Sequence, residues 1–149
     1  MGVHLDVSGN SIRVLPTENL FATSVKTHEY PGFPTDLQPP LAIAMTQASG
    51  RSLLHETVFE GRMQWTEDLK RMGANILVMD PFRIALEGPS KLHGREVESP
   101  DIRAGMAYVI AGLVAEGTTI TDHVELIDRG YERIEERLRA LGANITRSD

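Results

Sequence analysis

The chain repeats one short pattern three times, and this repetition constrains its fold more than any other feature. A large apolar residue, a glycine, a small residue and the start of a strand recur at residues 1–5, 72–76 and 141–145. The copies lie about 70 residues apart, a spacing typical of one supersecondary unit used repeatedly around a shared core. The later copies close a predicted helix and the first begins the chain, so we expect this sequence to start within a repeat and to be a piece of a larger protein.

A second set of positions supports the repeat. Trp65, Leu69 and Met72 have the spacing of one helix face. Ile134, Leu138 and Leu141 recur at the same spacing farther along the chain. Each predicted unit has the order β-α-β-α-β-β. We therefore expect the α+β class in one domain, with a partial repeat over residues 1–33, a repeat over 34–98 and a partial repeat over 99–149.

The predicted elements follow from periodicity and from turn and cap residues. We expect a hairpin over residues 3–15, an extended segment over 20–27, a loop over 30–34, helices over 38–48 and 66–72, and strands over 52–57, 75–79, 83–87 and 94–98. A helix capped by Ser99 then runs to Ala115, and its apolar residues predict that it is wholly buried. A strand over 118–121, a helix capped by Asp128 and ending at Leu141, and a strand over 144–146 complete the expectation.

Composition excludes several kinds of site. The net charge is −6, which argues against nucleic acid as a partner, because phosphate contacts need clustered Lys and Arg. The chain has no cysteine, which excludes disulfides and thiolate chemistry within it. Its five histidines are scattered, so we expect no metal and no cofactor. The longest apolar stretch is too short to cross a bilayer, and we expect no membrane contact and a cytoplasmic location.

Charged residues at element ends are the candidates for chemistry: Asp36, Arg62, Asp101, Arg103 and Arg129. The two aspartates precede long predicted helices, where an acid is also favoured by the helix dipole alone. The arginines fit either surface ion pairs or a cleft that binds phosphate or carboxylate through planar guanidinium groups. The spacing of these residues leaves both interpretations open.

Five motifs together resemble one family. They are Tyr-Pro-Gly-Phe-Pro-Thr-Asp-Leu-Gln at 30–38, Glu-Thr-Val-Phe-Glu-Gly-Arg at 56–62, Asp-Ile-Arg-Ala at 101–104, Gly-Leu-Val-Ala-Glu-Gly-Thr-Thr at 112–119 and Ile-Asp-Arg-Gly-Tyr-Glu at 127–132. In this order they resemble the UDP-N-acetylglucosamine 1-carboxyvinyltransferases, which are enolpyruvyl transferases, over residues 1–147. The departures, Pro40, Gly61 and Gly105, remove no charged group. Glycine at 105 is expected to cost about 0.5–1 kcal/mol relative to alanine in a helix interior.

The resemblance implies a fold and a reaction. The fold is an inside-out α/β barrel, or α-β prism, present here only as an incomplete C-terminal portion. The reaction adds the 3′-hydroxyl of UDP-N-acetylglucosamine (UDP-GlcNAc) to phosphoenolpyruvate and then eliminates phosphate, at the start of peptidoglycan precursor synthesis. The partners are therefore these two substrates and a missing N-terminal catalytic domain, and the isolated chain is expected to be inactive.

The resemblance also assigns roles to residues. Asp36 matches the residue that binds the sugar hydroxyl and acts as base, and Arg129 matches an arginine that closes on phosphoenolpyruvate. Val58 matches a position whose backbone contacts the sugar nucleotide. Arg62, Asp101 and Arg103 match a charged cluster that lines the substrate cleft. The alternative is a non-catalytic domain of the same descent that binds a sugar nucleotide or another protein.

Overall fold

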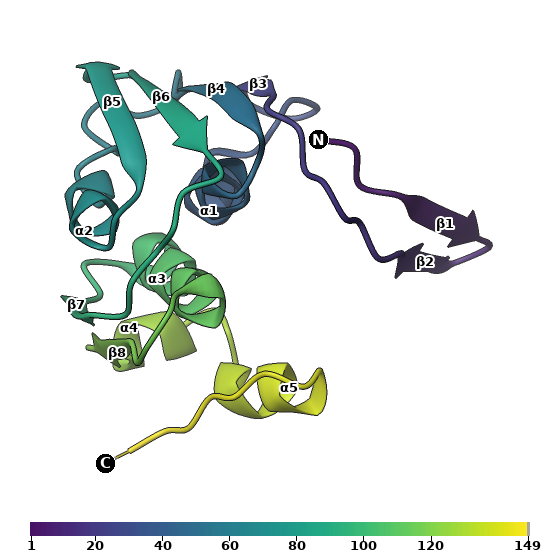
Figure 1. Ribbon diagram of the computed structural model, residues 1–149, viewed down its shortest axis with the longest axis vertical. Helices are drawn as coiled ribbons and strands as arrows, with labels where there is room; N and C mark the ends of the chain where they lie inside the picture. Colours follow the sequence, from purple (N-terminus) through teal and green to yellow (C-terminus); the bar gives the residue numbers. More distant parts are fainter. Residues whose placement is uncertain (149) are drawn as a thin grey trace.

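A mixed four-stranded sheet forms one side of the chain, of which the computed structural model describes residues 1–148. Its strand order is β3-β4-β6-β5. Strand β3 (Ser24–Lys26) runs parallel to β4 (Gly50–His55), whereas β6 (Arg83–Gly88) runs antiparallel to both β4 and β5 (Asn75–Asp80). Helices α1 (Gln38–Thr46) and α2 (Thr66–Arg71) lie together on one face of this sheet (Figure 1). Segregation of helices to one face of a largely antiparallel sheet is an α+β arrangement, as predicted.

The core lies between this sheet and a pair of helices. Helix α1 packs against α3 (Ile102–Val114), and Ala42, Ala107 and Ala111 are fully buried there. These small side chains allow the two helix backbones to approach closely, while the larger Ile43, Met45 and Tyr108 fill the space around them. The same core takes in Trp65, Leu69 and Met72 from α2 and its flanks, together with Ile84 and Leu86 from β6.

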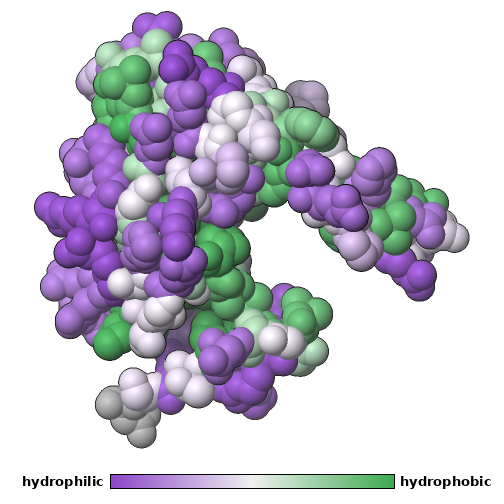
Figure 2. All heavy atoms as spheres, viewed as in Figure 1, coloured by the Kyte–Doolittle hydropathy of each residue, from purple (hydrophilic) through white to green (hydrophobic). Residues whose placement is uncertain are grey.

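Helix α3 is buried on all sides over residues 104–108 but is exposed near its C-terminus, so the prediction that it is wholly buried was wrong at that end. Leu113 and Val114 are 41% and 47% exposed. Figure 2 shows apolar surface along the side of the body that faces the hollow next to α3, while much of the opposite side is hydrophilic. Helix α3 therefore has more apolar surface than the described part of the chain buries.

Helix α3 connects the two strands of a second, smaller sheet. Strand β7 (Glu96–Glu98) precedes it, and β8 (Ile120–Asp122) returns parallel to β7. Helix α4 (Glu125–Asp128) then packs on α3 through the buried Ile127. The two sheets are therefore joined through α3 and the helices around it.

The predicted long helix from Asp128 to Leu141 is not formed. The chain instead makes α4, a turn, and a separate α5 (Ile134–Ala140). Asp128 ends α4 rather than capping a helix, and Arg133 before α5 is left-handed with φ 48°. Gly130 in the turn lies against Ile102, where an added Cβ would come within 2.4 Å of the isoleucine Cδ1. Packing of this turn on the start of α3 redirects the chain at the point where sequence periodicity predicted continuous helix.

The end of the chain also differs from the prediction. Leu141 is 85% exposed, and α5 contains no buried residue. Residues 144–146 are not a strand, and they pair with none of the described strands. Figure 1 shows α5 and the following segment set apart from the main sheet.

The predicted hairpin near the N-terminus is confirmed as β1 (Leu5–Ser8) and β2 (Ser11–Val14). Leu5 pairs with Val14 and Val7 with Ile12, so these four apolar side chains share one face. Every residue of both strands is exposed. The hairpin extends away from the body in Figure 1, and its apolar face has no cover from the described residues.

Candidate functional site

Asp36 lies where three segments of the chain meet. It belongs to the single turn of 3-10 helix η1 (Thr35–Leu37), which leads directly into α1. Its Oδ1 accepts hydrogen bonds from Arg62 at 3.1 Å and from Arg103 at 3.4 Å. Both contacts use the same oxygen, Oδ1, and the side chain is 69% exposed. Asp36 therefore presents its side chain at the surface while two guanidinium groups fix its orientation.

Arg62 is the most restrained of the candidate arginines. Its Nη1 also donates to Thr35 Oγ1 at 2.8 Å, and its guanidinium lies 3.9 Å from the centre of the Phe59 ring. Its side chain is only 20% exposed. Two hydrogen-bond acceptors and a cation–π contact hold the planar group in place before any ligand binds.

Asp101 and Arg103 form the other half of the cluster. Asp101 is the N-cap of α3 and accepts from the backbone N–H of Arg103 and Ala104 at 2.7 and 3.1 Å. Its Oδ2 also receives Arg103 Nη2 at 3.1 Å. Burial opposes ionisation of this carboxyl, but the two backbone N–H groups and Arg103 outweigh it and hold the pKa of Asp101 below its ordinary value. The predicted cap, Ser99, instead donates from its hydroxyl to the Asp101 carbonyl.

Glu56 is part of this site and was missed by sequence analysis. Its side chain is fully buried, and it accepts from the hydroxyl of Thr35 at 2.6 Å and from the backbone N–H of Val58 at 2.7 Å. Burial alone would raise its pKa, but hydrogen bonds from Thr35, Val58, Thr27 and Phe59 together lower it. An acid in a loop motif carries no sequence signal of burial, so only its place in the second motif pointed to it.

Val58 adjoins the cluster through Glu56. It is half-buried, and its backbone N–H is used by the Glu56 carboxylate. A ligand contact at this position would therefore use the Val58 carbonyl rather than its N–H.

Arg129 is placed differently from the other candidates. It follows α4, it is exposed, and it forms no ion pair within residues 1–148. The next residue, Gly130, lies against Ile102 at the start of α3, which brings this turn to the same end of α3 as Asp101. The structure thus joins Asp36, Arg62, Asp101 and Arg103 in one cluster, places Val58 beside it, and leaves the Arg129 side chain outside it.

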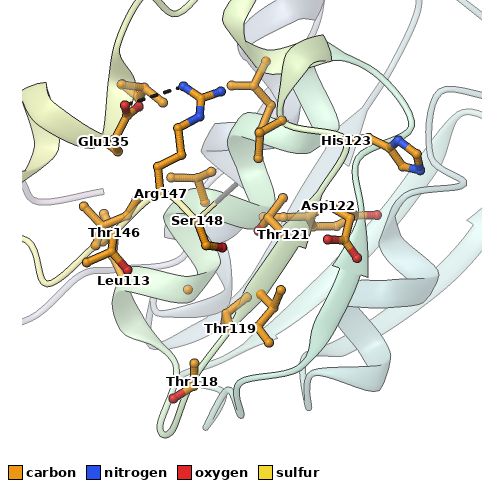
Figure 3. A pocket seen from close by; sticks show the side chains of 18 of the residues that line it. Leu113, Thr118, Thr119, Thr121, Asp122, His123, Glu135, Thr146, Arg147 and Ser148 are labelled. Atoms are coloured by element: carbon orange, nitrogen blue, oxygen red, sulfur yellow. Dashed lines mark ion pairs between the residues drawn. The ribbon is translucent and has the colours of Figure 1, made fainter.

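Two of the hollows in the described structure border α3. The smaller, about 180 Å³, is lined by members of the cluster and their neighbours: Pro39, Glu60, Gly61, Arg62, Gln64, Trp65, Pro100, Asp101, Arg103 and Ala104. The larger, about 460 Å³, contains Thr119, Asp122 and Arg147, and Figure 3 shows Arg147 paired with Glu135 across it. None of the six candidate residues lines the larger hollow. The charged candidates therefore favour the smaller one as part of a binding cleft.

Among residues 1–148, no three His, Cys, Asp or Glu side chains are grouped so that they could hold a metal ion. No helix within the same residues has the length and apolar character needed to span a bilayer.

Comparison with known proteins decides the family. Residues 1–138 match the family described as EPSP synthase (3-phosphoshikimate 1-carboxyvinyltransferase). The chain belongs to this family. Within it, the chain is 45% identical over 148 residues to UDP-N-acetylglucosamine 1-carboxyvinyltransferase 2 of Listeria monocytogenes. It is 47% identical over 147 residues to UDP-N-acetylglucosamine 1-carboxyvinyltransferase of Clostridium botulinum. Each match covers 99% of this chain and 35% of the relative, so the chain spans about a third of the length of these relatives.

Solved structures of the family agree with the fold. The enolpyruvyl transferase NikO from Streptomyces tendae superposes with a TM-score of 0.89 and 28% identity, over 98% of this chain and 34% of that one. An EPSP synthase from Acinetobacter baumannii has a TM-score of 0.56 and 17% identity over 89% of this chain, and shows the fold alone. The predicted enolpyruvyl transferase fold is confirmed in its incomplete form, since the described residues form no closed barrel.

Proposed function

We propose that this chain is the C-terminal portion of an enzyme that transfers the enolpyruvyl group of phosphoenolpyruvate to the 3′-hydroxyl of UDP-GlcNAc. The relatives at 45–47% identity carry the name of that activity. The observation that carries the proposal is the Asp36 carboxylate held by Arg62 and Arg103 beside a small cleft. In the cell this reaction would serve cell-wall precursor synthesis in the cytoplasm.

Asp36 is proposed as the base. As the sugar 3′-oxygen attacks C2 of phosphoenolpyruvate, its hydroxyl proton passes to the carboxylate and a general acid outside this chain protonates C3. In the later elimination C3 loses a proton, phosphate leaves C2, and the double bond is restored. The two arginines contact Oδ1 only, which leaves Oδ2 to receive the proton. A carboxylate oriented before the substrate arrives needs little rearrangement during the transfer.

The other cluster members are proposed to bind substrate. Arg62 and Arg103 present guanidinium groups that suit phosphate or carboxylate oxygens, and Asp101 orients Arg103 through their shared contact. Val58 is proposed to contact the sugar nucleotide through its carbonyl. Each of these side chains keeps its geometry through bonds to the protein, which is what a preorganised site requires.

Arg129 is proposed to bind phosphoenolpyruvate when the enzyme closes. Two observations support this role: the side chain is exposed, and the adjacent Gly130 lies against Ile102 at the start of α3, the end that carries Asp101. Closure of a second domain over the cleft would exclude water and strengthen these charged contacts.

Reconstitution tests the proposal. The 149-residue chain alone should release no phosphate from phosphoenolpyruvate and UDP-GlcNAc above a protein-free control, because it spans 35% of its relatives. A chimera in which this chain replaces the matching third of the Clostridium botulinum relative, here called the reconstituted enzyme, should be active. Phosphate release by the isolated chain would contradict the first expectation. A folded but inactive chimera would refute the transferase proposal and favour a non-catalytic domain.

A further inference from the structure

We propose that Glu56 is a positioning residue, whose buried carboxylate locks together the segment that carries Asp36 and the segment that carries Val58. This inference rests on the proposed function, since it concerns how the substrate site is held in shape. Glu56 itself would touch neither substrate.

The contacts of Glu56 come from three separate segments. Its Oε1 accepts from Thr27 Oγ1 at the end of β3 at 2.9 Å, and from the backbone N–H of Val58 and Phe59 at 2.7 and 3.2 Å. Its Oε2 accepts from Thr35 Oγ1 at 2.6 Å. All four donors are neutral, and the side chain is fully buried. A carboxylate in this setting is tolerated only because every contact donates to it, so each donor is held in one orientation.

One route leads from Glu56 to Asp36. The Thr35 hydroxyl has one hydrogen, and it gives this hydrogen to Glu56, so its lone pairs are available to Arg62 Nη1 at 2.8 Å. The same Nη1 donates to Asp36 Oδ1 at 3.1 Å. The carboxylate thus sets the direction of a hydrogen-bond chain that ends on the proposed base.

A second route leads from Glu56 through the loop of Val58. The carboxylate fixes the Val58 and Phe59 backbone, and the Phe59 ring lies under the Arg62 guanidinium. Thr27 anchors this arrangement to the sheet, since its backbone N–H donates to the His55 carbonyl at the end of β4 at 2.9 Å. Both routes meet at Arg62, so a change at Glu56 should displace Asp36, Val58 and Arg62 together.

Glu56→Gln is the direct test, because glutamine keeps the shape but has one acceptor oxygen where four donors converge. In the reconstituted enzyme we expect kcat to fall by about tenfold or more and UDP-GlcNAc to bind about tenfold more weakly, since small misplacements of reacting groups are costly. The KM for phosphoenolpyruvate should stay within about twofold. The matched control is Glu67→Gln, which makes the same change on the exposed face of α2 and should leave kcat and both substrates unaffected.

A double-mutant cycle separates positioning from a general loss of stability. Thr35→Val removes the hydroxyl through which Glu56 reaches Arg62. If Glu56 acts by that route, the double variant should be little less active than the more impaired of the two single variants. If the two effects are independent, the losses of the single variants should add in the double variant. Additive losses, or a Glu56→Gln enzyme with normal kinetics, would overturn the proposal.

Amide exchange gives a readout that needs no activity. In the 149-residue chain, hydrogen exchange at the Val58 and Phe59 amides should quicken in Glu56→Gln and stay slow in Thr35→Val and Glu67→Gln. Unchanged exchange in Glu56→Gln would overturn the anchoring role. If Glu56→Gln does not fold, Thr35→Val alone tests the route to Asp36, because it leaves three of the four donors to Glu56 in place. Normal kinetics in Thr35→Val would then refute that route. A reconstituted enzyme that is inactive without any substitution refutes the proposed function instead.

Discussion

Residues 34–98 and 99–148 carry the same sequence pattern but differ in how deeply it is buried. In the first stretch Trp65, Leu69 and Met72 are 6%, 0% and 0% exposed. Leu141, the counterpart of Met72, is 85% exposed, and its helix α5 has no buried residue. After α2 the chain continues into the β5–β6 hairpin, whereas no strand follows α5 in the described residues. An apolar helix face is thus specified locally, but its burial depends on which elements lie beside it.

The charged positions show a related difference. Arg62 and Arg129 occupy similar places in the two patterns, yet Arg62 is held by Thr35, Asp36 and Phe59, while Arg129 is exposed. Arg62 therefore belongs to a cluster formed in advance, and we propose that Arg129 acquires its contacts on ligand binding.

The largest expected effect tests the two aspartates that start the long helices. In the reconstituted enzyme Asp36→Asn should lower turnover by about 10²–10⁴-fold, because an amide cannot take the proton. Asp101→Asn should cost less than about tenfold, because asparagine still caps α3 and Asp101 only orients Arg103. Phosphate release measures both. Equal losses would mean that the two positions do not differ in role.

The difference in burial predicts a difference in stability. Leu69→Ala should destabilise the chain by about 2–5 kcal/mol, the usual cost of a cavity at a fully buried leucine. Leu138→Ala, at the matching position of α5, should cost about 1 kcal/mol or less, since that side chain is only half-buried. Urea unfolding followed by circular dichroism compares the two. A loss of stability clearly above about 1 kcal/mol in Leu138→Ala would show that α5 is packed more firmly than its exposure indicates.

A third prediction concerns the exposed arginine. Arg129→Lys should raise the phosphoenolpyruvate requirement or lower turnover at least about tenfold, a loss of roughly 1.4 kcal/mol, because a lysine cannot form the planar two-point contact. Binding of UDP-GlcNAc should hardly change. Equal weakening of both substrates, or unchanged kinetics, would make Arg129 a structural residue.

The smallest effect concerns the cap of α3. Asp101→Ala should cost about 1 kcal/mol near neutral pH, the usual value for a lost N-cap. Because the folded-state pKa of Asp101 is lowered, its ionised form stabilises the fold above the unfolded pKa, and that stability is lost as pH falls through the folded pKa. The gap between wild type and variant should therefore narrow in acid. A gap that is constant across that range would show that the charge contributes nothing.

Prediction succeeded where local signals were strong. The hairpin at β1–β2, the helices α1 to α3 and the paired strands β5 and β6 were predicted close to their observed bounds. The failures lie where tertiary contacts override periodicity, as in the turn at Gly130 that splits the last predicted helix. Gly105 is a further case. An added Cβ there would lie 2.1 Å from Ser99 Oγ and 2.7 Å from Ile127 Cγ1, so the residue expected to weaken α3 is needed for close packing.

The sequence by itself determined the class of elements, the repetition, the family resemblance and the set of charged candidates, because these depend on local pattern and on motifs that can be read along the chain. Only the tertiary structure decided which candidates meet. Asp36 and Arg103 are brought together from the starts of different helices by the packing of α1 on α3, and Glu56 is made part of the site by burial. Contacts between residues far apart in sequence depend on how helices and strands stack, and no local pattern encodes that arrangement.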